Sequence, residues 1–392
     1  MVDNRRRICF VSGTRSEYGL LCPLMRLVKS DQTLILQLIA TGTHFASSHG
    51  STIDFITRDG FEVDENVPID LSEDSPVSIA HAMADCLKGL ATALSRLRPD
   101  IMVVLGDRYE VLAAAQAAMI LRIPIAHIHG GEATEALIDE SIRHSVSKMS
   151  HIHFPVAAPY RDRIIQLGED PKRVHKVGAL CLDTFDEKTL LSREMLSKQI
   201  GFDLGAKYFV VTYHPVTLDI GDEIVPVNQM LCALDHFSDF KILITGVNAD
   251  PGNGSIGETL AAYAKKNETR VHLELSLGQY NYLSALSSAA AVIGNSSSGL
   301  IEAPALKTPT VNIGERQRGR VRASSVVDCG EKKDEIVAAI SIAISCEFRG
   351  QLNVMNYPFG TPGAALKIKE VLKNVELDSI LKKRFHNIKF AQ

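Results

Sequence analysis

The feature that most constrains the fold of this chain is a regular alternation of short apolar runs with segments of helical period. Bare apolar runs of this kind are typical of parallel sheets that are covered by helices on both faces. In the first half of the sequence, strands are expected at Arg7–Ser12, Leu34–Ala40, Phe61–Val67, Ile101–Leu105, Pro124–Ile128, His151–Pro155 and Val174–Val177. Helices are expected between them at Glu17–Ser30, Ser75–Leu97, Tyr109–Arg122, Ile138–Ser150 and Ala157–Leu167. Ser75 is predicted to cap its helix, with Pro76 at the first helical position.

The alternation restarts after a charged segment, Leu182–Phe202, which we interpret as the joint between two domains. In the second series, strands are expected at Lys207–Thr212, Lys241–Thr245, Val271–Glu274, Ala289–Ile293 and Pro309–Ile313. The length of 392 residues leaves each half enough chain to bury its own core. Alternating strands and helices imply parallel strands with right-handed crossovers, so the sequence predicts an α/β chain of two doubly wound, Rossmann-like domains.

Composition narrows the class of protein. The net charge of -4 gives no reason to expect a nucleic acid or an anionic membrane as a partner. The longest apolar stretch, Val111–Leu121, is far short of the roughly 20 residues that span a bilayer. The basic N-terminal residues precede only a strand-length apolar run, so no signal peptide is expected. Seven scattered cysteines without a CxxC pair favour a reduced, cytoplasmic protein.

Polar and glycine-rich segments follow most of the expected strands. Ligands of doubly wound sheets bind beyond the carboxyl ends of the strands, so these segments predict the site. Two open sheets that face each other would bring them together in one central cleft. The segments are Gly13–Ser16, Gly106–Arg108, His129–Glu132, His214-Pro215, Gly246–Asn248 and Gly294–Ser298.

The segment Gly294–Arg322 has the features of a nucleotide site. Three serines, at 296, 297 and 298, are expected to open a helix whose unpaired amides and dipole favour an anion. Glu302 lies one helical turn further on, where a carboxylate can accept hydrogen bonds from a ribose diol. The alternative is an ordinary strand, loop and helix with a serine cap. The chain contains neither GxGxxG after its first strand nor GxxxxGK[ST], so dinucleotide and P-loop sites lose their main support.

Three carboxylates and one histidine are the candidates for acid–base chemistry. Asp107 and Glu132 each follow a glycine turn, and Asp139 shares a helix face with Arg143. A carboxyl group with a raised pKa among them would suit proton abstraction. The alternatives are that Asp107 caps the next helix and that Asp139 is a cap or a partner of the helix dipole. His214 precedes a proline, where it can contact phosphate, act as an acid or be structural.

Two further histidine pairs raise the question of a metal. His127 and His129 alternate along one expected strand, and His151 and His153 along the next, so each pair would point to one side. No cysteine accompanies them and no HExxH motif is present. The prediction is that no metal is bound.

Six motifs resemble the hydrolysing UDP-N-acetylglucosamine 2-epimerases of bacterial sialic acid and legionaminic acid synthesis. They occur in the family's order from residue 8 to about residue 325, and six motifs in order are a specific signal. The HIHGGE and RQRGR forms favour the hydrolysing branch over the non-hydrolysing enzymes. The motifs are GTRSEYGLL, VVLGDRYE, HIHGGE, DESIRHSVSKMSH, YHPVT and IGNSSSGLIEAPALKTPTVNIGERQRGR.

The resemblance implies a glycosyltransferase-B type fold, in which two Rossmann-like domains face a central cleft that holds UDP. It also implies that the last helices return to the first domain. The expected domains are residues 1–182 with 364–392, and residues 183–363. Relatives form dimers or tetramers, so a homo-oligomer is expected.

The resemblance further implies a reaction and the roles of residues. A base removes the proton at carbon 2 of the sugar while UDP leaves carbon 1, and water then adds to the 2-acetamidoglucal with inversion at carbon 2. The products would be N-acetylmannosamine and UDP, with no NAD or other cofactor. The implied acid–base groups are Asp107, Glu132 and Asp139. Around the sugar, diphosphate and nucleoside, the resemblance places His214, Arg108, Ser296, Ser297, Glu302, Arg15, Asn248 and Arg316. Arg143, on the helix face of Asp139, is a further candidate for substrate binding.

Three alternatives remain at this point. The same motifs serve relatives that act on UDP-2,4-diacetamido-2,4,6-trideoxyglucose. A retaining glycosyltransferase on the same fold would need an acceptor. A nucleotide-sugar-binding module without turnover would not need three carboxylates beside a diphosphate.

Overall fold

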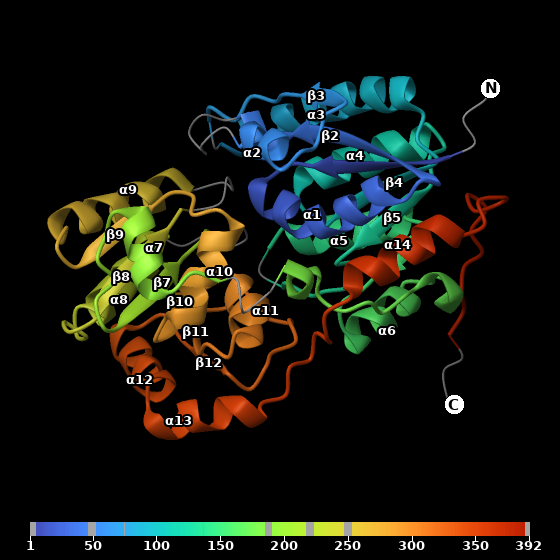
Figure 1. Cartoon of the computed structure of the whole chain (residues 1–392). Coiled ribbons are helices and arrows are strands. Elements are labelled where there is room, and N and C mark those ends of the chain that lie inside the picture. The colour runs from blue at the N-terminus through green and yellow to red at the C-terminus, as the bar shows by residue number, and fades with distance from the viewer. Residues whose placement is uncertain are drawn as a thin grey trace. The chain divides into compact units, whose positions relative to one another are not determined.

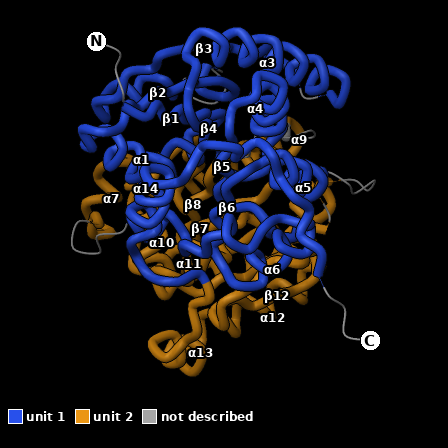
Figure 2. The backbone as a smooth tube through the Cα atoms, turned by 90° about the vertical axis from the view of Figure 1, so that its right-hand side faces the viewer, with its two compact units in different colours: residues 1–133, 138–184, 359–392 blue, residues 134–137, 185–358 orange. Residues whose placement is uncertain are grey.

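The computed structural model describes residues 5–45, 52–73, 75–135, 137–184, 190–216, 223–246 and 253–388. The chain forms two compact units (Figure 2). Unit 1 comprises Met1–Ala133, Ile138–Thr184 and Phe359–Gln392, and unit 2 comprises Thr134–Leu137 and Phe185–Pro358. The predicted domain boundaries, after 182 and before 364, stay a prediction about independently folding domains. Asn248, one of the predicted site residues, lies outside the described residues.

Unit 1 is built on a parallel sheet of six strands in the order β3-β2-β1-β4-β5-β6 (Figure 1). The strands are β1 Arg6–Ser12, β2 Leu34–Thr41, β3 Glu65–Val67, β4 Ile101–Leu105, β5 Ile125–Ile128 and β6 Ile152–Phe154. The α-helices of this unit are α1 Arg15–Ser30, α2 Ile53–Arg58, α3 Pro76–Leu97, α4 Tyr109–Ile120, α5 Asp139–Met149, α6 Ala158–Gln166 and α14 Ala364–Asn374.

Unit 2 contains a second parallel sheet, in the order β12-β11-β10-β7-β8-β9. Its strands are β7 Tyr208–Thr212, β8 Lys241–Thr245, β9 Val271–Glu274, β10 Ala291–Gly294, β11 Thr310–Ile313 and β12 Val326–Cys329. Its α-helices are α7 Arg193–Ile200, α8 Ile224–Leu234, α9 Asn253–Lys266, α10 Gln279–Ser288, α11 Ser298–Ala305, α12 Lys333–Ala343 and α13 Cys346–Gln351. The prediction of two doubly wound α/β sheets is confirmed.

The two sheets have the same strand order when each is numbered from its own first strand. In both, the first and fourth strands are neighbours: β1 pairs with β4, and β7 pairs with β10. The direction of winding reverses between these two strands, and such a switch point is where doubly wound sheets bind ligands. Each unit therefore has one topologically defined place for a site.

Alternating side chains of the central strands fill two cores, one on each face of the sheet of unit 1. Ile8 and Phe10 belong to the core that also contains residues of α1 and α14, whereas Cys9 and Val11 belong to the core under α3 and α4. Burying one such large apolar side chain contributes about 1.5–3 kcal/mol to the free energy of folding. The sheet is thus held rigidly from both sides, and its strand ends are fixed platforms for polar side chains.

Several element predictions are confirmed and others are wrong at the sheet edges. Helix α3 begins at Pro76, and the Ser75 hydroxyl accepts a hydrogen bond from the Ser78 N–H at 3.1 Å. The strand expected at Phe61–Val67 is shorter, Glu65–Val67. Val174–Val177 is no strand, because only one bridge, between His153 and Val174, forms there. Strand β12 was not predicted.

Candidate functional site

The switch point of unit 1 collects buried acidic side chains. Asp107 and Arg108 follow β4, and Glu110 lies in the first turn of α4 with only 1% of its surface exposed. Arg108 Nε donates to Glu110 Oε2 at 3.3 Å. The N-cap of α4 is Arg108 and its side chain makes no cap bond, so Asp107 is not the cap of this helix. The Asp107 carboxylate instead binds Arg143.

Arg143 on α5 is the largest fully buried side chain of the chain's described part. Its Nε donates to Asp107 Oδ2 at 2.8 Å, and its Nη2 contacts the same oxygen. Its Nη1 donates to the Glu132 carbonyl oxygen at 3.1 Å and to Glu140 Oε2 at 2.8 Å. Burial lowers the pKa of this guanidinium, but the charges of Asp107, Glu132 and Glu140 outweigh burial and raise it. Arg143 therefore stays charged and fixes the Asp107 carboxylate by charge-assisted hydrogen bonds.

Glu132 and Asp139 lie on either side of the turn between β5 and α5. Glu132 is 2% exposed, and its Oε1 lies 3.2 Å from His129 Nδ1. Asp139 is the first residue of α5, whose N-cap, Ile138, makes no side-chain cap bond. Asp139 therefore occupies the first turn, where a carboxylate interacts favourably with the helix dipole. Within unit 1, Arg143 brings Asp107, Glu140 and the Glu132 backbone together.

Glu17 and Glu110 are acids of this switch point that sequence reasoning did not single out. Glu17 is 7% exposed, and its Oε2 accepts a hydrogen bond from the Gly13 N–H at 2.8 Å. Burial, reinforced by the negative charge of Glu110, raises the pKa of Glu17 to about 8. The Thr14–Glu17 spacing is that of a capping box, which was the available signal. A capping box alone does not predict burial of the acid.

Arg15, predicted to contact the nucleotide, begins helix α1 next to this switch point. Its guanidinium carbon lies 3.8 Å from the centroid of the Phe55 ring, a cation–π contact. Helix α1 is capped by Thr14, whose hydroxyl accepts from the Glu17 N–H at 3.2 Å. The turn after β1 is therefore held by both its cap and its aromatic neighbour.

The switch point of unit 2 is built from amides, hydroxyls and one buried arginine. The Asn295 side chain accepts from the His214 N–H at 2.8 Å and donates to the His214 carbonyl oxygen at 2.8 Å. This pairing joins the chain after β7 to the chain after β10. Gly294 makes the junction possible, because a Cβ atom there would lie 2.0 Å from the Thr212 carbonyl oxygen. The sequence analysis placed Asn295 only within the segment Gly294–Ser298 that follows a strand.

Arg316 reinforces the same junction. Its Nε donates to the Pro215 carbonyl oxygen at 3.1 Å and its Nη1 to the Asn295 carbonyl oxygen at 3.2 Å. Gln317 Nε2 donates to that Asn295 oxygen at 2.7 Å. Arg316 is 6% exposed, so a charge is buried at this end of the sheet. These contacts bring His214 and Arg316 together, two of the predicted site residues.

The serine segment differs from its prediction. Helix α11 begins at Ser298 rather than Ser296, and Ser297 is its N-cap without a side-chain cap bond. Ser296 Oγ accepts a hydrogen bond from the Ser298 N–H at 3.4 Å. Ser296 and Ser297 therefore form a non-helical turn before α11 and are not part of its first turn. The Ser298 hydroxyl accepts from Tyr282 Oη at 2.7 Å. Glu302 lies on α11, and its charge contributes to the raised pKa of Tyr282, about 12, for which burial is the main cause.

The histidine pairs are not arranged as predicted. His129 lies beyond β5 and has a positive φ of 65°, and His151 precedes β6. The two histidines that face each other are His127 and His153, register partners on adjacent strands. Burial lowers the pKa of both, to about 3 for His127.

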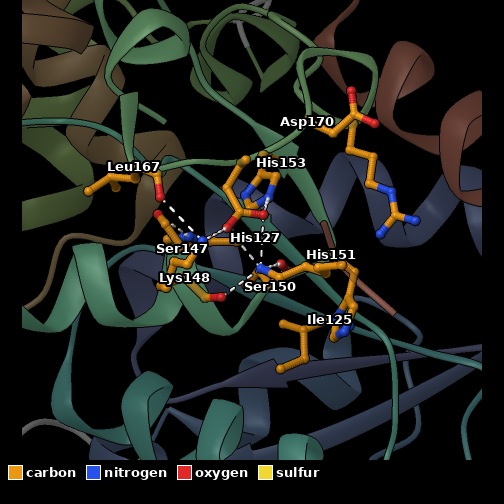
Figure 3. A network of polar contacts seen from close by, with 12 residues as sticks. Ile125, His127, Ser147, Lys148, Ser150, His151, His153, Leu167 and Asp170 are labelled. Carbon is orange, nitrogen blue, oxygen red and sulfur yellow. Dashed lines mark hydrogen bonds and ion pairs between the residues drawn. The ribbon is translucent and has the colours of Figure 1, made fainter. Parts of the chain in front are cut away.

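Each buried histidine has a structural partner (Figure 3). His127 Nδ1 lies 3.1 Å from Ser147 Oγ, and its Nε2 lies 2.8 Å from the Gly106 carbonyl oxygen. His153 Nε2 lies 3.2 Å from Glu169, which also binds Lys148 and Lys383. Across the described ranges, no group of three or more His, Cys, Asp or Glu side chains is arranged to hold a metal ion. Nor does any described helix combine the length and the apolar character needed to cross a membrane.

Comparison with known proteins identifies the family. The model of the family described as UDP-N-acetylglucosamine 2-epimerase matches residues 26–373. A Campylobacter jejuni protein named GDP/UDP-N,N'-diacetylbacillosamine 2-epimerase (hydrolyzing) is 38% identical over 97% of this chain and 99% of its own. The Escherichia coli polysialic acid biosynthesis protein P7 is 35% identical over 94% of each chain.

Solved structures share the fold. The UDP-GlcNAc 2-epimerase of Methanocaldococcus jannaschii, in complex with UDP-GlcNAc and UDP, superposes with a TM-score of 0.78 at 18% identity. The superposition covers 93% of this chain and 99% of that one. Together with the family match, these relatives show that the chain belongs to the UDP-N-acetylglucosamine 2-epimerase family.

Proposed function

We propose that this chain is a hydrolysing UDP-N-acetylglucosamine 2-epimerase, which converts UDP-GlcNAc and water into N-acetylmannosamine and UDP. The observation that carries the proposal is the set of buried and partly buried carboxyl groups at the switch point of unit 1, where Arg143 binds the carboxylates of Asp107 and Glu140 and the backbone carbonyl of Glu132. Repulsion between like charges makes such a set unsuited to holding a diphosphate by itself. Acid–base chemistry at the sugar is what these groups can supply.

The proposed reaction has two steps. A carboxylate takes the proton from carbon 2 while the bond between carbon 1 and the diphosphate oxygen breaks, which gives a 2-acetamidoglucal and UDP. Water then adds to the double bond: its hydroxyl goes to carbon 1, and a carboxyl group returns a proton to carbon 2 on the opposite face. Asp107, Glu132 and Asp139 are the proposed acid–base groups. Because Arg143 holds Asp107 by charge-assisted hydrogen bonds, Asp107 suits the role of a base more than that of an acid.

The leaving group must be stabilised as its charge develops. Carbon 2 of the sugar is only weakly acidic, so elimination requires that UDP leave with its charge already neutralised. We assign this role to Arg15, Arg108 and His214 and to the serine turn at Ser296 and Ser297. Glu302 is proposed to bind the ribose, and Asn248 and Arg316 to support the nucleotide. Arg316 would act indirectly, since its described contacts hold the backbone next to His214.

A second substrate is favoured by the name of a relative. The Campylobacter jejuni protein carries a name for a 2-epimerase of GDP- or UDP-N,N'-diacetylbacillosamine, and it is 38% identical to this chain. The same carboxyl groups and the same elimination would act on UDP-2,4-diacetamido-2,4,6-trideoxyglucose, because carbons 1 and 2 are alike in both sugars. Either product would enter the synthesis of a nonulosonic acid.

The test is product analysis by NMR with each candidate nucleotide sugar. UDP-GlcNAc, UDP-2,4-diacetamido-2,4,6-trideoxyglucose and the GDP form of the latter are incubated separately with the protein. The proposal predicts free N-acetylmannosamine and UDP from the first, and the substrate with the highest kcat/KM identifies the true one. Release of UDP without inversion at carbon 2 would contradict an epimerase, and sugar transfer to an added acceptor would indicate a glycosyltransferase.

Two features of context are also proposed. The family resemblance supports a homo-oligomer, either a dimer or a tetramer, which light scattering after size exclusion would detect. Cysteine usage and the nucleotide-sugar substrate support a location in the cytoplasm. Among the described cysteines none forms a disulfide, in keeping with a reducing compartment.

A further inference from the structure

The Glu17 carboxyl lies where the proposed reaction does not need an acid. It is on α1, behind the turn that follows β1, and its Oε2 accepts the Gly13 N–H at 2.8 Å. Glu110 approaches the same glycine from α4: a Cβ atom built on Gly13 would lie 3.4 Å from Glu110 Cβ and 3.4 Å from Glu17 Oε2. The two acids thus flank one backbone position, and both are buried.

Two buried carboxyl groups that flank one residue repel each other when both are charged, and burial disfavours the charged form of each, so a single shared proton is favoured. Glu110 is bound to Arg108 Nε at 3.3 Å, a charge-assisted contact that favours its ionised form. The proton of the pair therefore belongs on Glu17. The raised pKa of Glu17, about 8 through burial and the charge of Glu110, agrees with this assignment.

We propose that Glu17 is a positioning residue: its carboxyl, paired with that of Glu110 across Gly13, carries the proton that leaves Glu110 charged and bound to Arg108. The proposal rests on the proposed function in one respect, namely that Arg108 contacts the diphosphate. If Glu17 loses its proton, the second negative charge competes for Arg108 and repels Asp107 and the substrate. Glu17, which touches no reacting atom, would then determine the pH above which the affinity for the nucleotide falls.

The other charged groups around Glu17 are Arg108, which lowers its pKa, and Asp107, which raises it. His44, on the turn Gly42–Phe45 that contacts Gly13, is bonded to the Ser12 and Thr52 hydroxyls. Burial lowers the pKa of His44 to about 4, so it stays neutral over the range in question.

The first test measures stability and needs no substrate. The pKa of Glu17 is about 8 in the folded chain, against an ordinary value of 4.5. Between these pH values Glu17 holds a proton that the unfolded chain has lost, so it makes the wild type less stable as pH rises. Glu17→Gln removes this loss. The difference in urea midpoint between Glu17→Gln and wild type should widen from about pH 5 to about pH 8 and then stay constant. Glu376→Gln, at an exposed position of the same unit, is the matched control, and its difference from the wild type should not widen over this range.

The second test measures UDP binding by calorimetry between about pH 7 and about pH 9. The wild type should lose affinity severalfold above about pH 8, by up to about tenfold per pH unit, and Glu17→Gln should not. Glu110→Gln should weaken binding at every pH, because Arg108 loses its partner. A stability difference that does not change with pH would overturn the shared proton. Parallel loss of affinity in wild type and Glu17→Gln would overturn the positioning role.

These outcomes are separable from the proposed function. A wild type that binds UDP but does not epimerise would refute the reaction and leave both tests in force. A wild type that binds no UDP would refute the proposed function together with the role of Arg108, while the urea experiment would still decide where the proton lies.

Discussion

The two units share one topology and differ in the chemistry at its switch point. In unit 1 the chain ends of β1 and β4 carry Glu17, Asp107 and Glu110, with Arg143 as the buried counter-charge. In unit 2 the corresponding ends, of β7 and β10, carry the His214–Asn295 junction and the serine turn. Strand order alone therefore does not decide function. It decides where polar side chains gather, and in the proposed function the acids of unit 1 transfer protons while the polar end of unit 2 binds the nucleotide.

The difference extends to how each end is held together. The acidic end of unit 1 depends on a charged clamp, since Arg143 contacts three acidic residues from a fully buried position. The polar end of unit 2 depends on neutral hydrogen bonds to the backbone, made by Asn295 and Gln317, with Arg316 added. Losing one partner of a buried ion pair leaves an uncompensated charge, whereas losing one neutral hydrogen bond costs less. Substitutions in the two units should therefore differ in size as well as in kind.

The largest effect is expected from neutral isosteres of the acids in unit 1. Asp107→Asn or Glu132→Gln should lower kcat by about 100- to 10,000-fold, because general acid–base groups contribute that much to rate. UDP affinity should be unchanged or slightly higher, since a negative charge near the diphosphate is removed. Steady-state kinetics and calorimetry measure the two quantities on the same preparations. If UDP affinity falls by the same factor as kcat, these acids of unit 1 contribute to nucleotide binding, and the proposed division of roles between the units is wrong.

The next effect concerns the clamp itself. Arg143→Met should lower the free energy of unfolding by about 3–5 kcal/mol, because Asp107 and Glu140 would lose their buried counter-charge. Arg161→Met, at an ion pair with Asp162 on the surface of the same unit, should change it by about 0–1 kcal/mol. Urea unfolding of both variants gives the comparison. Equal stability of the two variants would mean that the clamp does not hold unit 1 together.

A feature of the fold or of the site could be predicted from the sequence when it depends on neighbouring residues, and could not when it depends on residues far apart in the chain. The central strands and the cap at Ser75 follow from local pattern; the cap was predicted correctly, and the central strands were predicted with small differences at their ends. The burial of Glu17 and Glu110 depends on the packing of α1 and α4 around Gly13, and no local sequence pattern predicts a contact between two helices. His127 and His153 lie side by side because of the register between β5 and β6. The prediction considered alternation within each strand only, so it paired His127 with His129 and His151 with His153. Strand β12 is short, partly exposed and interrupted by Asp328, which hides its apolar signal.

The polar end of the sheet of unit 2 was predicted in outline and not in detail. The sequence indicated a serine turn and an acid one turn later, and Ser297 and Glu302 do lie on either side of the start of α11. It did not indicate the Asn295 amide bridge, because an asparagine after a strand is most often a turn residue. The sequence pattern thus missed residues such as Asn295 and Gln317, whose side chains hold the backbone of other segments in place.

Smaller effects are expected in unit 2. Glu302→Ala and Ser297→Ala should each weaken UDP binding by about 0.5–1.5 kcal/mol, the usual contribution of one hydrogen bond, with fold stability little changed. Glu315→Ala, at a side chain that is 69% exposed, is the matched control and should bind UDP like the wild type. Calorimetry would measure all three. If Glu302→Ala and Ser297→Ala bind UDP normally, the nucleotide does not use this turn.

The smallest effect is expected from Tyr282→Phe. The phenol donates to the Ser298 hydroxyl at 2.7 Å and contacts the start of α11 without carrying charge. Removing it should weaken UDP binding by less than about 1 kcal/mol, and it should have no further effect when Ser298 is already alanine. A double-mutant cycle of Tyr282→Phe and Ser298→Ala measures this coupling. Additive losses would show that Tyr282 acts on UDP by another route.

The central claim is that carboxyl groups of unit 1 move a proton at carbon 2 of the sugar. The direct measurement is the wild-type reaction with UDP-GlcNAc in deuterated water, followed by NMR of the released sugar. Elimination and hydration predict one solvent deuterium at carbon 2 of every molecule of N-acetylmannosamine, because the returning proton comes from a group that exchanges with water. N-acetylmannosamine incubated with the protein and UDP controls for later exchange. Released N-acetylmannosamine that carries hydrogen at carbon 2 would contradict the claim.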